Sequence, residues 1–228
     1  MSQECAAVIV AAGTAQRMQG IDKMLTPLAG QPVILRSVRA LARSKRIARI
    51  YIVTREDLLP TVTELCSNEE KFCGAVCGGS SRAESVLCGL KAVGESAAFI
   101  AIHDGARPLA TAELIDAAIE GAERYGAAAP AIPVHDTIKR VRDGFVQETP
   151  DRSTLYAVQT PQVFAQPLIV SALSAAMEQG IPLTDDCSAV EAMGKPVFLT
   201  PGSTENLKIT VPSDLILAEA IIKEREGL

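Results

Sequence analysis

AAVIVAAG, residues 6–13, is the stretch on which the fold assignment rests. The segment Ala6 to Val10 is a short apolar run typical of a buried strand, and the small residues Ala11, Ala12 and Gly13 follow it. Small residues let backbone N–H groups come close to an anion. The next cations, Arg17 and Lys23, can neutralise the charge that develops when a phosphoryl group is attacked. The sequence therefore predicts a phosphate-binding loop after the first strand.

Two further polar loops follow apolar, strand-like runs. One begins with GGSSR at Gly78, and the other is HDGARP, which begins at His103. Parallel α/β sheets bind their ligands outside the carboxyl ends of the strands. We therefore expect the three loops to converge on one edge of a sheet.

Composition limits the class of protein. The chain has 228 residues, of which 48% are hydrophobic and 21% charged, as in an ordinary globular protein. This length fits one large α/β domain, and we expect a single domain over residues 1–228. The net charge of -5 argues against duplex nucleic acid as the main partner, so any anion site must be locally basic.

Neither a membrane anchor nor a zinc site is predicted. The N-terminal MSQE lacks the positive segment of a signal peptide, and the apolar run behind it is far shorter than the roughly 20 residues of a membrane helix. We expect a cytoplasmic protein. The six cysteines form no C-x-x-C pair and only two histidines accompany them, so zinc is poorly supported and most cysteines are expected to be small buried side chains.

Strand-like and helical patterns alternate along the chain, which predicts parallel βαβ units. The fold class is therefore α/β, with a mostly parallel sheet flanked by helices. The expected strands are Ala6–Val10, Arg49–Val53, Phe72–Val76, Ala98–His103, Ala127–Ile132 and Val197–Thr200, and the expected helices are Pro32–Arg43, Asp57–Cys66, Arg82–Val93, Ala112–Tyr125, Pro167–Glu178, Cys187–Met193 and Pro212–Arg225.

One segment breaks the alternation. Thr137–Arg142 and Phe145–Thr149 flank Asp143-Gly144, a strong hairpin turn signal. The hairpin is too polar for the core, so we expect it to project as a β-arm at about residues 134–158. Exposed strand edges usually find a partner, which predicts a homodimer joined through this arm.

The first two loops each have a structural alternative. Residues 13–18 match neither the G-x-G-x-x-G fingerprint nor a P-loop, so this loop taken alone is equally well explained as a tight turn with solvated Arg17 and Lys23. The Gly78 loop can likewise be a turn in which Ser80 or Ser81 caps the following helix. Ser85, one turn into that helix, would still offer a hydroxyl to a nucleotide.

The third loop carries the metal prediction. Asp104 ends an apolar strand, where a carboxylate is a natural ligand for Mg²⁺ bridging phosphate oxygens. The alternative is an ion pair between Asp104 and Arg107 that orders the loop. We assign Arg107 and His103 structural roles. Late in the chain, the alternating stretch Glu205–Thr210 predicts a short strand that carries Lys208.

Taken together, these motifs resemble one family, the 2-C-methyl-D-erythritol 4-phosphate cytidylyltransferases of the non-mevalonate isoprenoid pathway. The resemblance covers nearly the whole chain in the family's order. It rests on AAG (11–13) with Arg17 and Lys23, GGSSRAESV (78–86), HDGARP (103–108), Asp136-Thr137, TPQ (160–162) and NLKIT (206–210).

This resemblance implies a Rossmann-like nucleotidyltransferase fold, a homodimer with exchanged β-arms, and Mg²⁺-dependent transfer of CMP from CTP to a methylerythritol phosphate with release of pyrophosphate. It implies that Arg17 and Lys23 stabilise the transition state and that Asp104 holds the metal. The remaining implied roles are positioning of the substrate phosphate by Arg152, Lys208, Thr137 and Thr160, with Thr137 and Arg152 entering the neighbouring subunit's site, and nucleotide binding by Ala11, Ala12, Gly13, Gly79, Ser85 and Gly105.

Three other functions compete with this one. A cytidylyltransferase for another polyol phosphate, such as ribitol 5-phosphate, would share several of these motifs. A non-catalytic module that senses CTP would not need Arg17, Lys23, Asp104 and Lys208 together. An NAD(P)-dependent oxidoreductase would place an acidic residue about 20 positions beyond the glycines, where this chain has Pro32-Val33-Ile34.

Overall fold

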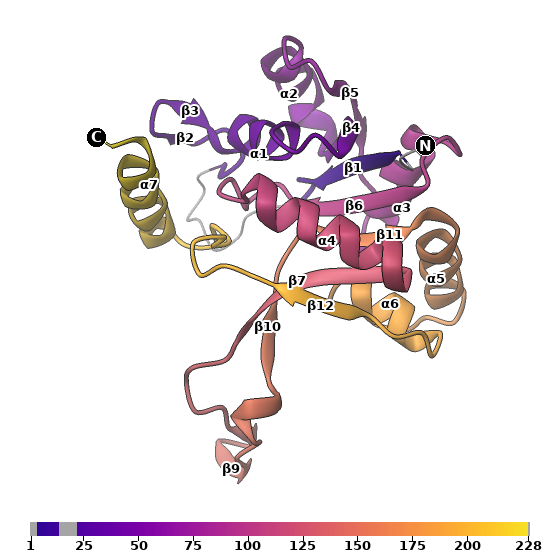
Figure 1. The fold of residues 1–228 in the computed structure, drawn as a ribbon, viewed down its shortest axis with the longest axis vertical. Coiled ribbons are helices and arrows are strands. Elements are labelled where there is room, and N and C mark those ends of the chain that lie inside the picture. The colour runs from indigo at the N-terminus through magenta and orange to yellow at the C-terminus, as the bar shows by residue number, and fades with distance from the viewer. Residues whose placement is uncertain (1–3, 14–21, 228) are drawn as a thin grey trace.

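A computed structural model describes residues 4–13 and 22–227, and it is built around one eight-stranded sheet (Figure 1). The order of the strands is β10-β7-β11-β6-β1-β4-β5, and β12 pairs with β7. The sheet strands are β1 (Cys5–Val10), β4 (Ile47–Thr54), β5 (Phe72–Cys77), β6 (Phe99–Asp104), β7 (Ala127–Pro133), β10 (Tyr156–Val158), β11 (Gln162–Ala165) and β12 (Phe198–Pro201). Two small hairpins lie apart from it: β2 (Pro27–Leu28) with β3 (Gln31–Pro32), and β8 (Arg140–Arg142) with β9 (Phe145–Glu148).

Helices cover both faces of this sheet. The helices are α1 (Val33–Ala42), α2 (Leu59–Cys66), α3 (Arg82–Val93), α4 (Ala112–Tyr125), α5 (Gln166–Glu178), α6 (Asp186–Ala192) and α7 (Pro212–Glu226), with short 3-10 turns at Glu56–Leu58 and Arg152–Thr154. One buried apolar cluster joins the sheet to α1, α2, α4 and α7, and a second joins it to α3, α5 and α6. The predicted α/β class with a mostly parallel sheet is confirmed.

The order of the strands changes direction at β1. This strand pairs in parallel with β4 on one side and with β6 on the other, and Val10 lies opposite both Val53 and Asp104. The chain passes from β1 to β4 and β5 and then crosses back to β6, so the direction of winding reverses at β1. Such a reversal is where parallel α/β sheets bind their ligands.

Sequence reasoning missed one central strand. β11 lies between β6 and β7 and runs antiparallel to both, with Gln162 opposite Ile102 and Val163 opposite both Ala101 and Ala128. The stretch has only four residues and leads directly into α5, so it lacks the length of a recognisable strand. The predicted strand at Glu205–Thr210 is wrong: these residues form an extended loop, because loops rather than a neighbouring strand satisfy their backbone groups.

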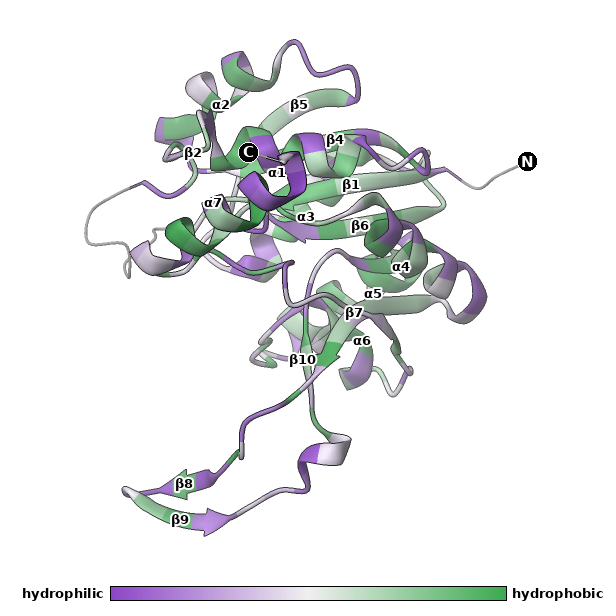
Figure 2. Ribbon diagram, turned by 60° about the vertical axis from the view of Figure 1, so that its left-hand side comes forward, coloured by the Kyte–Doolittle hydropathy of each residue, from purple (hydrophilic) through white to green (hydrophobic). Residues whose placement is uncertain are grey.

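The predicted arm, residues 134–158, leaves the sheet after β7 and returns as β10 (Figures 1 and 2). Its tip is the β8–β9 hairpin, in which Asp143 and Gly144 both have positive φ, 51° and 82°. This geometry is that of a tight two-residue turn, as the Asp-Gly pair predicts. Figure 2 shows apolar segments on the arm even though it extends away from the core.

Cysteine burial agrees with the expectation only in part. All six cysteines are free thiols, and Cys5, Cys66 and Cys187 are buried. Cys73 and Cys77 are exposed because they lie on β5, the edge strand of the sheet. None of the helices within the described residues is long and apolar enough to span a lipid bilayer. Location in the cytoplasm stays a prediction.

Phe164 tests how much the inserted strand contributes to stability. Its side chain is fully buried in β11. Replacing it with alanine removes a large buried ring and leaves a cavity, so Phe164→Ala should lower the free energy of unfolding by about 3–5 kcal/mol in urea denaturation. Leu217→Ala is the control, because Leu217 on α7 is 55% exposed and should cost less than about 1 kcal/mol. Equal losses in the two variants would contradict a structural role for β11.

Candidate active site

The three polar loops meet at the carboxyl ends of β1, β5 and β6. Backbone hydrogen bonds fix each exit: the N–H of Ala11 donates to Val53 O at 2.7 Å, that of Gly78 to Thr54 O at 2.8 Å, and that of Gly105 to Val10 O at 2.9 Å. Each loop is thereby tied to the end of a neighbouring strand. The convergence expected from the sequence is present.

Two glycines let the loops approach one another. A Cβ added to Gly78 would lie 2.7 Å from the Cβ of Ala12, and one added to Gly105 would lie 3.1 Å from the Cβ of Ala11. The first loop is therefore packed between the second and the third. Because a larger side chain at any of these positions would separate the loops, their small residues have a steric purpose as well as leaving backbone N–H groups accessible.

Asp104 lies at the centre of the site. Its carboxylate receives hydrogen bonds from Arg82 Nη1 and Lys208 Nζ, each at 2.7 Å, and Arg107 Nε lies 3.8 Å away. Asp104 is 6% exposed. Burial raises the pKa of this carboxyl, but the attraction of Arg82 and Lys208 outweighs it and holds the pKa well below its ordinary value. Asp104 is therefore ionised at neutral pH.

Arg82 connects Asp104 to a second buried carboxylate. Its Nη2 donates to Asp186 Oδ2 at 2.6 Å, and Asp186 is 1% exposed. Burial raises the pKa of Asp186, and Arg82 opposes that shift. We call Asp104, Arg82, Lys208 and Asp186 the Asp104 cluster. Sequence reasoning missed Arg82 and Asp186 as site residues, because both lie in the first turn of a helix, where charged residues are common.

Thr160 and Gln162 fix the elements around this cluster. Thr160 Oγ1 accepts the backbone N–H of Asp104 at 3.0 Å and lies 3.1 Å from Nδ1 of His103. Gln162 Oε1 accepts the N–H groups of Asp186 and Cys187, both at 3.0 Å, which anchors the first turn of α6. Thr160, just before β11, and Gln162, its first residue, thus hold β6 and α6 in place together.

His103 has the structural position expected of it. It is fully buried, and Nε2 lies 3.0 Å from Arg107 O. Burial lowers the pKa of His103 to about 4, so the ring is neutral at pH 7. Arg107 also has the structural position expected of it, because its Nη1 donates to Asn206 O at 2.6 Å.

The loop that carries Lys208 is anchored on both sides. Asn206 Nδ2 donates to Thr160 O at 3.0 Å and to Gln159 Oε1 at 3.2 Å. The N–H of Ile209 donates to Ala106 O at 2.8 Å. These bonds replace the predicted strand pairing, and they bring Lys208 to the Asp104 carboxylate from more than a hundred residues along the chain.

The loop that begins at Gly78 leads directly into α3. Ser81 is the N-cap and accepts the N–H of Glu84 at 3.1 Å, as one of the two predicted caps. Ser85 is buried, donates to Ser81 O at 2.8 Å and accepts the N–H of Gly79 at 3.2 Å. Its hydroxyl therefore shapes the loop in this structure.

The remaining predicted residues lie elsewhere. Arg17 is outside the described residues. Lys23 lies in a turn beside Asp22, which pairs with Arg55 at 2.7 Å. Thr137 and Arg152 are exposed on the arm, where Arg152 Nη1 donates to His135 O at 2.8 Å. One chain therefore brings together Asp104, Thr160 and Lys208 with the three loops, but it does not bring Thr137 or Arg152 to them.

The site suits phosphate chemistry. It combines loops of small residues at the strand exits with the cations Arg82 and Lys208, which can neutralise anionic oxygens. Among residues 4–13 and 22–227, no group of three or more His, Cys, Asp or Glu side chains could hold a metal ion alone. The single carboxylate of Asp104 nevertheless fits Mg²⁺, which is usually held by one or two carboxylates together with water and substrate phosphates.

Comparison with known proteins indicates one family. Residues 5–224 match the family model described as 2-C-methyl-D-erythritol 4-phosphate cytidylyltransferase. Proteins with that name from Caldanaerobacter subterraneus and Geobacillus kaustophilus are 44% and 41% identical to this chain, covering 96% of it and 98% and 97% of the relatives. The crystal structure of 4-diphosphocytidyl-2C-methyl-D-erythritol synthase from Anaerococcus prevotii superposes with a TM-score of 0.87 at 28% identity, covering 98% of this chain and 100% of that one.

The Asp104 cluster predicts a large stability cost when its central cation is removed. Arg82→Met leaves Asp186 buried without a partner and weakens the pairing of Asp104, so the free energy of unfolding should fall by about 3 kcal/mol in urea denaturation. Adding Asp186→Asn should recover part of this loss, because the unpaired charge is then gone. Arg49→Met is the control: it breaks a partly exposed pair with Glu4 and should cost at most about 1 kcal/mol. An Arg82→Met loss no larger than that of the control would contradict this account of the cluster.

Proposed function

The chain belongs to the 2-C-methyl-D-erythritol 4-phosphate cytidylyltransferase family, and we propose that its cytidylyl transfer takes place at the Asp104 cluster and the three loops around it. The enzyme transfers CMP from CTP to 2-C-methyl-D-erythritol 4-phosphate, which gives 4-diphosphocytidyl-2-C-methyl-D-erythritol and pyrophosphate. The observation that carries the assignment of the site is the meeting of Asp104, Lys208 and Thr160 at the reversal of the sheet.

The reaction joins two anions. An oxygen of the substrate phosphate attacks the α-phosphorus of CTP, a new P–O bond forms, and the bond to the β-phosphate bridging oxygen breaks as pyrophosphate leaves. The attacking phosphate is already ionised near pH 7, so no general base is needed. The site therefore acts chiefly by positioning and by neutralising charge.

We assign transition-state stabilisation to Arg17 and Lys23, on the loop after β1. As cations beside the triphosphate they would offset the negative charge on the α-phosphate and on the departing pyrophosphate. Ala12 and Gly13 would offer backbone N–H groups to the triphosphate, and Ala11, whose own N–H donates to Val53 O, would line the site beside them. Gly79, Ser85 and Gly105 would complete the nucleotide site. The close contact of Gly105 with Ala11 supports a shared surface.

Asp104 is the residue that would hold Mg²⁺, the cofactor expected for this reaction. When bound, Mg²⁺ supplies positive charge to phosphate oxygens. Lys208 and Arg82 neutralise the Asp104 carboxylate in this structure. Because the Lys208 side chain is 39% exposed, it could turn from Asp104 toward a substrate phosphate. Thr160 orients the backbone of Asp104, which supports a positioning role.

Thr137 and Arg152 would complete the substrate site from a second subunit. Both lie on the arm of residues 134–158, whose tip is a two-stranded hairpin with exposed Val141, Phe145 and Val146, the phenyl ring 75% exposed. A two-stranded hairpin is at best marginally stable alone in water. We infer that this arm packs against a second copy of the chain and delivers Arg152 there, so the working enzyme is a homodimer.

Lys23→Ala separates binding from turnover. With CTP and Mg²⁺, the wild-type enzyme should release pyrophosphate faster with 2-C-methyl-D-erythritol 4-phosphate than with ribitol 5-phosphate. We expect Lys23→Ala to lower kcat by about a hundredfold to a thousandfold, because one cation is lost from the transition state, while the Kd for CTP changes far less. Lys45→Ala, an exposed lysine outside the site, is the control. A full kcat in Lys23→Ala would refute the catalytic assignment.

Mixing two inactive variants tests the arm. Arg152→Met affects the arm and Lys208→Met affects the body, and each homodimer should be nearly inactive. In a co-expressed mixture half of the dimers are mixed, and each mixed dimer has one site with both residues intact, so about a quarter of the wild-type activity should return. If the arm serves its own chain, no activity returns. Sedimentation of a monomer at micromolar concentration would overturn the dimer itself.

A further inference from the structure

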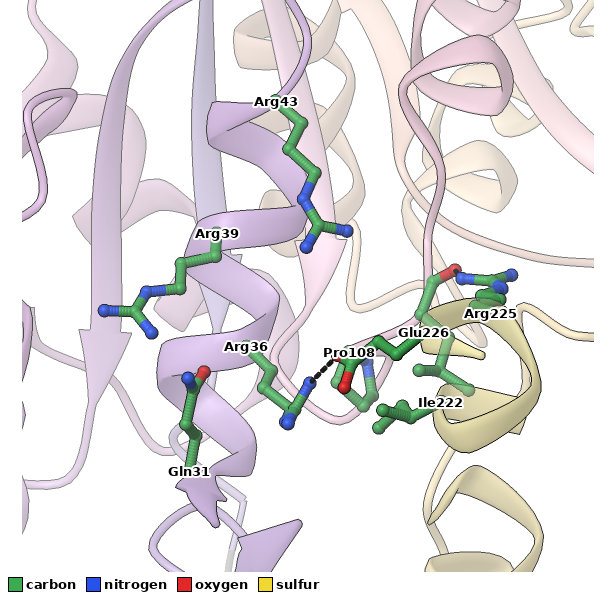
Figure 3. A pocket seen from close by; sticks show the side chains of 9 residues that line it. Gln31, Arg36, Arg39, Arg43, Pro108, Ile222, Arg225 and Glu226 are labelled. Atoms are coloured by element: carbon green, nitrogen blue, oxygen red, sulfur yellow. Dashed lines mark hydrogen bonds and ion pairs between the residues drawn. The ribbon is translucent and has the colours of Figure 1, made fainter. Parts of the chain in front are cut away.

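A second cationic cavity lies on the side of the molecule where α1 faces α7. It has a volume of about 180 Å³ and contains four arginines, Arg36, Arg39 and Arg43 from α1 and Arg225 from α7 (Figure 3). Among the described residues that line it, Glu226 is the one carboxylate. None of Asp104, Arg82 and Lys208 lines this cavity, so it is separate from the active site. We call it the arginine pocket.

The three arginines of α1 and its cap lie close enough together to repel one another. Arg36, Arg39 and Arg43 are three and four positions apart, which places them along one face of α1 and its C-terminal cap. Burial lowers the pKa of Arg36, and Arg43 and Arg39 lower it further against the opposing effects of Glu226 and Glu219. Like charges at this spacing destabilise a helix. In a chain with a net charge of -5, four arginines gathered around one cavity need a reason.

Two of the guanidinium groups are held in place by neutral acceptors. Arg36 donates through Nε to Leu28 O at 2.6 Å and through Nη2 to Ala29 O at 2.7 Å, and Arg225 donates through Nη1 to Leu109 O at 3.0 Å. Carbonyl groups fix the direction of a guanidinium without cancelling its charge. The charge of Arg36 is therefore preorganised, whereas Nε and Nη2 of Arg225 also donate to Glu205 Oε2, at 2.9 and 2.7 Å.

Three of the four arginines lie within 4.0 Å of a carboxylate. Glu69 pairs with Arg39 at 2.8 Å and Glu205 with Arg225 at 2.7 Å. Glu226 approaches Arg36 no closer than 4.0 Å and is 49% exposed, so this pair is weak. Within the part of the chain that the structure describes, Arg43 makes no ion pair, and Figure 3 shows it on the same side of α1 as Arg36.

We propose that the arginine pocket binds a small anion with a phosphate or diphosphate group that carries at least two negative charges. Guanidinium groups match phosphate oxygens in charge and geometry and can donate two hydrogen bonds to one group. The volume of about 180 Å³ is several times the roughly 30 Å³ that one water molecule occupies, so such a group fits. Pro108 and Ile222 provide an apolar wall. Glu226 is the carboxylate that the incoming anion displaces from Arg36.

Calorimetric titration of the full-length enzyme tests the proposal. Inorganic pyrophosphate and glycerol 3-phosphate are the two probes, each at constant ionic strength, and they distinguish an inorganic diphosphate from a phosphate ester. The wild type should bind the preferred probe at a second site besides the active site. Arg39→Gln/Arg43→Gln should weaken that second site by at least about tenfold and leave kcat unchanged. The control Arg124→Gln/Lys195→Gln loses the same charge from two exposed residues outside the pocket and should bind as the wild type.

Glu226→Gln provides a test of opposite sign. Removing the competing carboxylate should tighten anion binding about two- to fivefold, whereas an arginine pocket with a purely structural role predicts no gain. Glu226 is half exposed, so this variant should fold even if the double arginine variant does not. Unchanged binding in Arg39→Gln/Arg43→Gln, or weaker binding in Glu226→Gln, would overturn the proposal.

Discussion

The buried carboxylate of Asp104 is the constraint on which the site depends. It ends the central strand β6, and two cations from distant parts of the chain, Arg82 on α3 and Lys208 in the loop before α7, are drawn to it at 2.7 Å. A carboxylate that is 6% exposed cannot stay ionised without such partners. The same charge that orders the site therefore also fixes the position of α3 and of the C-terminal loop. The group that orders this region is also the one proposed to hold Mg²⁺, and carboxyl groups with strongly shifted pKa values tend to lie in functional sites.

Charge is distributed unevenly over the molecule. The chain is acidic overall, yet positive side chains gather around Asp104 and between α1 and α7. In both places some guanidinium groups are held by backbone carbonyls as well as by carboxylates: Arg107 by Asn206 O, and Arg36 by Leu28 O. Fixing a cation through neutral dipoles leaves its field available to a ligand. Local potential, not net charge, decides which anions approach such an enzyme.

Much of the fold could be predicted, because the local hydrophobic periodicity of the sequence indicates most of its helices and strands. The bounds expected for α3 and α4 agree with the structure, since each helix has a hydroxyl N-cap and a glycine after its last turn. β11 was not predicted, because four residues carry no measurable period and their place between β6 and β7 is a long-range property. Glu205–Thr210 alternates like a strand, yet Asn206 and Ile209 bond to loops. In the candidate site, the apolar strand before it marked Asp104, whereas Thr160 and Lys208 were named only through the family resemblance. The bridge from Arg82 to Asp186 joins residues about a hundred positions apart and leaves no local signal.

The antiparallel insertion of β11 has a consequence for synthesis on the ribosome. β1, β4, β5 and β6 can pair as soon as residue 104 has emerged, but the strand that covers the outer edge of β6 arrives only with residues 162–165. Until then the N–H and C=O groups on this edge of β6 are unpaired and can form hydrogen bonds with another nascent chain. Ala127 to Pro133 emerges first and is apolar enough to compete for that edge. Correct folding therefore requires that β7 does not pair with β6 before β11 has been synthesised. A chaperone that covers the β6 edge would be most useful during this interval.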